Sequence, residues 1–190
     1  AGLVARGGVV VLTGAGMSTD SGIPDYRGPG SVPRSPMTYQ DFVGSARAQQ
    51  RYWARAYVGW SRMWRAEPND GHRALAVLER AGAVDLVITQ NVDGLHTAAG
   101  SRAVIDLHGR IDQVVCLGCR DVTSRAHVQQ RLAAANEGFL LEGDVLAAPD
   151  GDADLDDTAG FSVVGCERCG GVLKPDVVFF GENVQRPVVD

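Results

Sequence analysis

The sequence predicts an α/β protein with a Rossmann-like parallel sheet and a small zinc-ribbon insert. Three observations support this fold class. Short apolar runs at residues 9–12, 84–88 and 103–107 have the β-branched character of buried parallel strands. The first run leads directly into a glycine-rich turn, as in dinucleotide-binding folds. Two Cys-x-x-Cys pairs, at residues 116–119 and 166–169, have the spacing of zinc ligands.

The composition excludes several functional classes. The chain has 190 residues and a formal net charge of -5, which argues against broad nucleic-acid binding. No apolar run is long enough to span a membrane, and no charged-then-apolar leader opens the chain. We therefore expect a cytoplasmic protein (mitochondrial matrix in a eukaryote) with no nucleic-acid or membrane partner. The composition does not specify the oligomeric state, and a monomer is the default expectation.

The turn after the first strand carries the clearest ligand signal. Gly14 and Gly16 let the backbone turn tightly and approach a ligand closely. Residues 18–20 (Ser-Thr-Asp) can then cap a helix whose amides face an anion such as pyrophosphate. The third glycine of the dinucleotide fingerprint is displaced to Gly22, so these glycines alone leave a plain turn as an equal alternative. Residues 21–27 (Ser-Gly-Ile-Pro-Asp-Tyr-Arg) are not required for a turn between a strand and a helix, and they favour a ligand-covering loop.

Polar residues follow the next two predicted strands. Asn91 and Asp93 come after the second strand, and His108 ends the third. The carboxyl ends of parallel strands meet at one edge of a sheet, where such sheets bind ligands. A histidine in such a cleft is a suitable general base. The remaining histidines are explained as capping, packing or surface groups: His72, His96 and His127.

The four cysteines favour one tetrahedral zinc ion. Two disulfides or one redox pair are the alternatives. A reducing compartment disfavours the disulfides, and two matched pairs disfavour the redox motif. Residues 120–165, between the pairs, form a long insert. We interpret its acidic middle, residues 150–157, as a solvated loop, because it lacks the glycine and glutamate of an EF-hand.

Residues 38–65 have helical periodicity. Tyr52 and Arg55 are three apart on this helix and are expected to fall away from its buried side. That side is an aromatic stripe predicted to lie in the core, made of Trp53, Tyr57, Trp60 and Trp64. A second helix, capped by Asn69 or Asp70, is predicted to turn four apolar residues inward: Ala74, Leu75, Val77 and Leu78.

Four stretches of the sequence resemble the sirtuins, the NAD-dependent protein deacylases. They are residues 14–27, 89–96, 107–109 and 174–182. Tyr26 and residues 51–55 and 148–152 resemble the class II branch, which includes a mitochondrial lipoamidase/ADP-ribosyltransferase and its bacterial homologues.

The resemblance implies transfer of the acyl group of acyl-lysine in a protein substrate to the ADP-ribose of NAD, with release of nicotinamide. It implies His108 as the catalytic base and Asn91 as a second catalytic residue. Implied contacts to NAD are Gly14, Ala15, Gly16, Ser18, Thr19, Asp25, Tyr26, Arg27, Gln90, Asn91, Val92, Asp93 and His108. Cys116, Cys119, Cys166 and Cys169 would hold one structural zinc per chain. The substrate peptide would add a strand to Val177, Val178, Phe179, Phe180, Gly181 and Glu182, and Tyr52 with Arg55 would bind an acidic acyl chain.

We divide the chain into a Rossmann-like part (1–109), a zinc module with its insert (110–173) and a return to the Rossmann-like part (174–190). Sirtuins continue with strand–helix units that bind the adenosine half of NAD. We therefore expect a sheet that is incomplete at the C-terminus, in a chain truncated there and slightly trimmed at the N-terminus. Mono-ADP-ribosylation and a non-catalytic zinc-ribbon interaction module are the alternative functions.

Overall fold

The computed structural model describes residues 7–26, 28, 36–139, 155 and 157–184. Contacts between residues divide the chain into two units. The first holds the described residues within 1–34, 65–109 and 184–190, and the second holds those within 35–64 and 110–183. No helix of the described part is long and apolar enough to cross a membrane.

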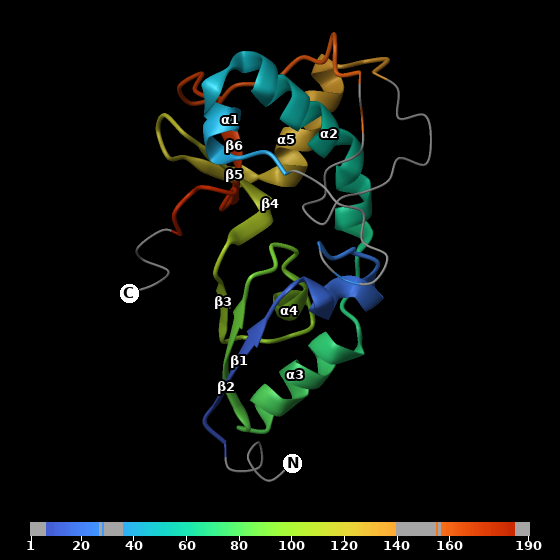
Figure 1. Cartoon of the computed structure of the whole chain (residues 1–190), viewed down its shortest axis with the longest axis vertical. Coiled ribbons are helices and arrows are strands. Elements are labelled where there is room, and N and C mark those ends of the chain that lie inside the picture. The colour runs from blue at the N-terminus through green and yellow to red at the C-terminus, as the bar shows by residue number, and fades with distance from the viewer. Residues whose placement is uncertain (1–6, 27, 29–35, 140–154, 156, 185–190) are drawn as a thin grey trace. The chain divides into compact units, whose positions relative to one another are not determined.

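The first unit is built on a three-stranded parallel sheet in the order β1-β2-β3 (Figure 1). Its strands are β1 (Val9–Thr13), β2 (Val84–Thr89) and β3 (Val104–Asp106). Thr13 pairs with Thr89, which pairs with Asp106, so the three carboxyl ends lie at one level. The segments after the strands, which start at Gly14, Gln90 and Leu107, therefore leave the sheet at the same edge.

Strand β1 is only half-buried, whereas the sequence predicts a buried strand. The side chains of Val10 and Leu12 are 57% and 64% exposed. In the central strand β2, by contrast, Val84 and Val87 are buried. A run of apolar residues identifies the strand but does not reveal what covers each face; among the described residues nothing covers the face that carries Val10 and Leu12.

Three helices accompany this sheet: η2 (Ala15–Ser21, a 3-10 helix), α3 (Asp70–Arg80) and α4 (Leu95–Ala98). Asn69 caps α3, as predicted, because its side chain accepts hydrogen bonds from the amides of Gly71 and His72. The predicted inward face of α3 is partly wrong: Ala74 and Val77 are exposed, and His72 and Ala76 are the fully buried residues.

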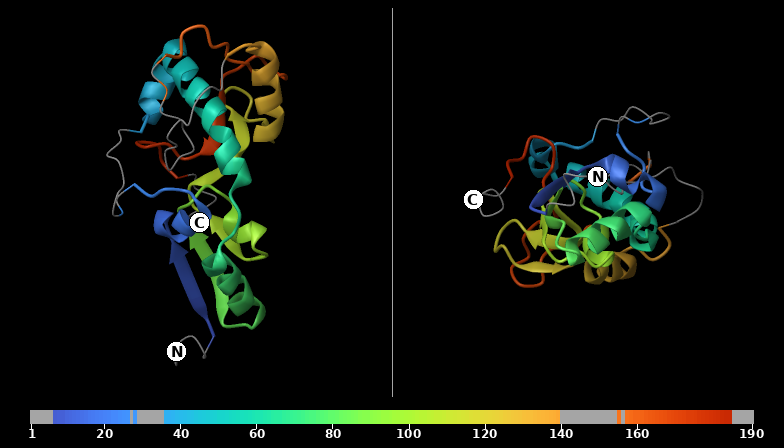
Figure 2. Two further views of the ribbon diagram at one scale, coloured as in Figure 1. Left: turned by 90° about the vertical axis from the view of Figure 1, so that its right-hand side faces the viewer. Right: turned by 90° about the horizontal axis from the view of Figure 1, so that it is seen from below.

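The second unit contains the helices α1 (Tyr39–Gly44), α2 (Ala46–Arg65) and α5 (Arg125–Ala135). The helical stretch predicted at residues 38–65 is thus two helices, separated at Ser45, whose backbone is extended. Thr38 and Asp41 form a capping box at the start of α1. Figure 2 shows α2 (teal) and α5 (orange) side by side.

The aromatic stripe of α2 is confirmed at Trp53, Tyr57 and Trp60, which are buried, but not at Trp64, which is 66% exposed. Tyr52 was expected outside the core, and this is wrong because it is only 4% exposed. Its ring lies 5.4 Å from that of Phe42 and 5.1 Å from that of Phe179. Tyr52 is drawn inward by partners that are distant in sequence and invisible to helical periodicity.

The sheet of the second unit has the order β5-β4-β6, with strands β4 (Gly109–Cys116), β5 (Val122–Ser124) and β6 (Leu173–Val177). Strands β4 and β5 are antiparallel. Both β5 and α5 lie in the insert, where the sequence analysis identified no element. The available signals were Ser124, which caps α5, and Val128 with Leu132, which are four residues apart and fully buried.

Arg125 joins α5 to α2 and is only 1% exposed. Its guanidinium carbon lies 5.2 Å from the ring centre of Trp53 and 4.8 Å from that of Trp60. Its Nη2 donates a hydrogen bond of 3.0 Å to the carbonyl of Ala56, and its Nη1 donates to Gln129. Aromatic faces and a backbone carbonyl thus surround this buried cation.

We expect Arg125→Met to lower the free energy of unfolding by about 2–4 kcal/mol, since it removes two cation–π contacts and the hydrogen bonds to Ala56 and Gln129. Urea denaturation followed by tryptophan fluorescence measures this. The matched control is Arg73→Met on the surface of α3, which should change stability by less than about 0.5 kcal/mol. An unchanged midpoint for Arg125→Met would contradict this role.

Candidate functional site

A polar network joins the glycine turn to the loop after β2. The hydroxyl of Ser18 donates to Asp93 Oδ2 at 2.7 Å. Asn91 Nδ2 donates to the same hydroxyl at 3.0 Å and to the carbonyl of Gly14 at 3.1 Å. Ser18 is only 1% exposed, whereas Asn91 and Asp93 are half-buried. Residues that are more than 70 positions apart in sequence are thereby held at the sheet edge where the sequence predicts a site.

Asp93 also fixes the course of its own loop. Its Oδ1 accepts a hydrogen bond of 2.9 Å from the amide of Leu95, the first residue of α4. Gly94, between them, has φ of 72°, in the left-handed region that glycine adopts without strain. The carboxylate of Asp93 therefore bridges the start of α4 and the glycine turn.

His108 follows β3 and is oriented by the same loop. Its Nδ1 lies 3.0 Å from the carbonyl oxygen of Gln90. A carbonyl only accepts hydrogen bonds, so Nδ1 carries the proton and, in the neutral ring, Nε2 has the free lone pair. The ring is half-buried. This geometry gives a general base with a defined basic atom.

The glycine turn offers backbone amides to a ligand. The first hydrogen bond of η2 runs from the amide of Met17 to the carbonyl of Gly14, so the amides of Ala15 and Gly16 have no partner within the helix. A Cβ built on Gly16 would meet no atom within 4 Å, which leaves this part of the turn open. An anionic group such as a phosphate fits such amides.

The predicted capping by residues 18–20 is wrong. Gly14 is the residue that caps η2, without a side-chain bond, and residues 18–20 lie inside the helix. Ser18 instead joins the polar network, and Thr19 donates to the carbonyl of Gly16.

The covering loop is described only in part. Asp25 accepts a hydrogen bond of 2.7 Å from the amide of Gly28, and Tyr26 is half-buried. Arg27 lies outside the described residues. Val92 is half-buried, between Asn91 and Asp93.

Two buried histidines of the first unit lie next to each other, and the sequence predicts no common role for them. His72 and His96 are 0% and 2% exposed, and their ring centres are 4.7 Å apart. His72 Nδ1 accepts from the amide of Asn69, in the capping role expected of it, and His96 Nε2 bonds to the hydroxyl of Thr13. Burial is the main cause that lowers the pKa of both rings, and the charge of Asp93 opposes it.

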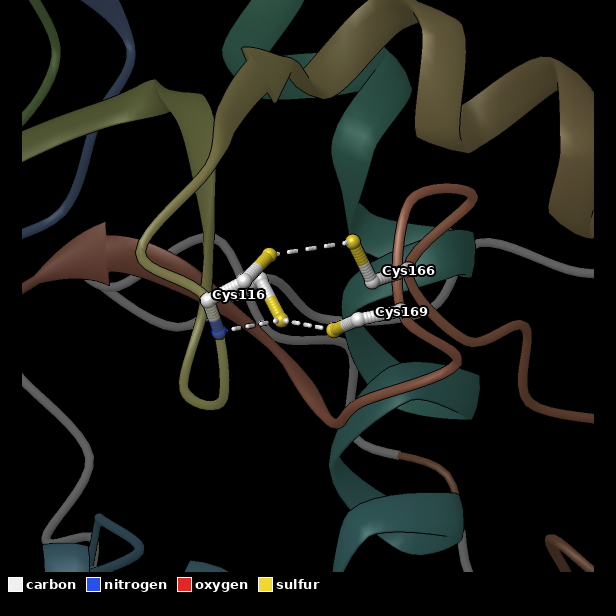
Figure 3. A group of neighbouring side chains, drawn as sticks. Cys116, Cys166 and Cys169 are labelled. Atoms are coloured by element: carbon white, nitrogen blue, oxygen red, sulfur yellow. Dashed lines mark hydrogen bonds between the residues drawn. The ribbon is translucent and has the colours of Figure 1, made fainter.

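The second unit brings the four cysteines together (Figure 3). Their sulfur atoms all lie within 4.8 Å of one another. Cys116 and Cys169 have an Sγ–Sγ distance of 3.5 Å, and Cys119 and Cys166 one of 3.7 Å. A disulfide needs about 2.05 Å, whereas a tetrahedral zinc with Zn–S bonds of about 2.3 Å places its sulfurs about 3.8 Å apart. The cluster therefore fits one zinc ion and no disulfide.

The local backbone prepares Cys116 for a metal. Hydrogen bonds from backbone amides, that of Cys119 first, lower the pKa of the Cys116 thiol to about 7. A thiolate, the form that binds zinc, is therefore accessible near neutral pH. Gly171 passes close to two sulfurs, since a Cβ there would lie 3.0 Å from that of Cys116 and 3.1 Å from that of Cys169.

The predicted substrate-binding stretch leaves the end of β6. Phe179 is buried against Phe42 and Tyr52, whereas Phe180 is 53% exposed. The carbonyl of Phe180 accepts a hydrogen bond of 2.9 Å from the amide of Tyr39. Arg55 is part-buried, and its Nε donates to the carbonyl of Leu155 at 2.9 Å.

Residues 14–190 match the sequence model of the Sir2 family. "NAD-dependent protein deacetylase 1" of Mycobacterium avium (strain 104) is 58% identical over 185 residues, which are 95% of this chain and 66% of that protein. "NAD-dependent protein deacylase SIR4" of Monosiga brevicollis is 53% identical over 189 residues, 94% of this chain and 61% of that protein. The chain thus spans less than two thirds of these curated relatives.

Solved structures of Sir2 proteins are similar to this chain. One described as "Sir2-p53 peptide-NAD+" has a TM-score of 0.72 at 33% identity and covers 99% of this chain and 66% of its own. Another, "Structure of Sir2Tm bound to a propionylated peptide", has a TM-score of 0.67 at 30% identity and covers 99% of this chain and 65% of its own.

The lowered pKa of His72 and His96 predicts acid sensitivity. In the unfolded chain a histidine has a pKa of about 6.5. In the folded chain the pKa values of His72 and His96 are lower. At a pH between the folded and unfolded pKa values, the unfolded state therefore binds more protons than the folded state. The stability is fully present above about pH 6.5 and falls as the pH drops below it. Urea denaturation of His72→Asn and His96→Asn should show a flatter pH dependence over this range. The matched control, His127→Asn, should keep the slope of the parent, and a parent slope in both buried-site variants would contradict the prediction.

We also expect one zinc ion per chain, measured by elemental analysis. Because zinc binding supplies roughly 10–16 kcal/mol in small structural sites, a chelator should unfold the second unit, and added zinc should restore it. A metal content of zero, or a disulfide mapped among the four cysteines, would refute this site.

Proposed function

The chain belongs to the Sir2 family, and on this premise we propose that the protein is an NAD-dependent protein-lysine deacylase. The observation that carries the proposal is the orientation of His108, whose Nδ1 donates to Gln90 and whose Nε2 is left as a base at the sheet edge. The relatives named as deacetylase and deacylase support it.

We assign cofactor binding to the first unit. The amides of Ala15 and Gly16 would bind the phosphates of NAD, with Ser18 and Thr19 shaping the turn around them. Asp25, Tyr26 and Arg27 would cover the bound cofactor. When bound, NAD supplies the ADP-ribosyl group that accepts the acyl chain with loss of nicotinamide.

The loop after β2 would orient the nicotinamide end. Asn91 Nδ2 is committed to Gly14 and Ser18, so its Oδ1 is the atom that can accept a hydrogen bond from a ribose hydroxyl or a water. The peptide groups of Val92 and Asp93 would hold the carboxamide. His108 Nε2 would take the proton of a ribose hydroxyl, a role in which a positioned base contributes about 10²–10⁴-fold in rate.

The substrate would be an acylated lysine in an extended peptide. Residues 177–182 continue β6 and would pair with the peptide as an added strand. The solved relatives described with a p53 peptide and with a propionylated peptide support this substrate class. Tyr52 and Arg55 are proposed as readers of a dicarboxyl acyl chain such as a glutaryl group. An equal loss of activity of Arg55→Met on glutaryl-lysine and acetyl-lysine peptides would refute that part.

The zinc would be structural. Four thiolates, from Cys116, Cys119, Cys166 and Cys169, complete its tetrahedral shell, so no position is open for water. The proposed compartment is the cytoplasm, because reduced cysteines persist there and can hold the metal.

The proposal predicts that His108→Ala loses activity without losing the fold. We expect nicotinamide release from NAD and an acetyl-lysine peptide to fall at least about 10²-fold, with the thermal midpoint unchanged. The full-length protein is used, and His127→Ala, a surface histidine of the second unit, is the control with parental turnover. Formation of acylated ADP-ribose distinguishes deacylation from ADP-ribosylation, and parental turnover in a folded His108→Ala protein would refute the assignment.

A further inference from the structure

Lys174 is the only lysine in the sequence; the other cations among the 18 Lys and Arg residues are all arginine. It lies in β6 and is only 3% exposed. A buried ammonium is costly unless acceptors surround it. Its surroundings therefore indicate what this one lysine does.

Three oxygens converge on the Lys174 ammonium. Its Nζ donates to the carbonyl of Val177 at 2.5 Å, to the carbonyl of Pro175 at 3.3 Å and to Glu182 Oε2 at 3.1 Å. An ammonium is compact and has three donors that rotate freely, whereas the planar fork of arginine cannot aim at three acceptors around one point. Lysine is thus the cation that this geometry requires.

Glu182 completes the arrangement from the other end of the stretch. The same Oε2 that binds Lys174 accepts a hydrogen bond of 2.9 Å from the amide of Phe179. The ammonium also lies 4.7 Å from the ring centre of Phe179. Lys174 therefore contacts the carbonyl of Val177 and the ring of Phe179, and Glu182 binds the amide of Phe179. The ion pair between Lys174 and Glu182 links the two sets of contacts.

We propose that Lys174 is a positioning residue that, with Glu182, presets the backbone of residues 177–181 for the incoming substrate peptide. The inference rests on the proposed function of this stretch. A peptide that adds as a strand gains affinity when the edge it meets is already ordered, because ordering then costs nothing on binding.

Stability alone does not account for the pair. A buried ion pair is weak support for stability, since desolvation offsets much of its attraction and apolar residues of similar size often serve as well. Arg125 provides the comparison within the same unit: it is also buried, also bonded to a backbone carbonyl and also over aromatic rings, but it joins α2 to α5 and touches no residue of 177–182 in the bonds described.

The test compares Lys174→Met with Arg125→Met in the full-length protein. We expect Lys174→Met to raise the KM for an acetyl-lysine peptide roughly tenfold, as expected when a loop must be ordered on binding, while kcat and the KM for NAD stay within about twofold of the parent. Hydrogen exchange of the amides of residues 177–182 should become faster in Lys174→Met and not in Arg125→Met.

Glu182→Gln covers the case in which Lys174→Met fails to fold. It keeps the side-chain size and an oxygen for the amide of Phe179 but removes the charge that faces Lys174, so the same changes should appear in smaller measure. Unchanged exchange and peptide KM in a folded variant, or an equal peptide effect in Arg125→Met, would overturn the inference. A parent protein that releases no nicotinamide would refute the proposed function instead, and the exchange comparison would still decide the role of Lys174.

Discussion

The parallel pairing of Thr13, Thr89 and Asp106 is the constraint on which the candidate site of the first unit depends. Because three strands end at one level, their following segments meet without any long loop. Ser18 and Asp93 are then joined by a hydrogen bond at that edge, and His96, which packs on His72, bonds to Thr13 at the end of β1. A shift of one residue in any strand would turn its side chains to the other face and separate the network.

The second unit also has a three-stranded sheet, and contacts between side chains reinforce it. The cysteine cluster fixes one end of β4, and Arg125 with Trp53 and Trp60 fixes the helices beside it. Trp53 also donates a hydrogen bond of 3.0 Å to the carbonyl of Leu173 in β6. The cysteine cluster, a buried cation and one indole therefore add to the strand pairing of the second unit.

The sequence predicts those parts of this protein whose cause is local. Apolar runs predict the three strands of the first unit, the residue type of Asn69 predicts the helix cap, and the Cys-x-x-Cys spacing predicts the cysteine cluster. The burial of Tyr52, the exposure of Val10 and the His72–His96 pair depend on what lies opposite each side chain, which periodicity does not contain. Helix α5 was missed because its apolar positions are few and its docking uses an arginine, a residue usually placed at the surface.

The burial of Lys174 has a consequence for the chemical reactivity of this side chain. A side-chain amine reacts with acyl donors only when it is exposed and uncharged. The amine of Lys174, the only lysine in the sequence, is buried and hydrogen-bonded to Glu182. In the folded state Lys174 is therefore shielded from acyl donors. The same amine becomes reactive on unfolding, so amine-directed labelling of Lys174 reports opening of the second unit at a single position.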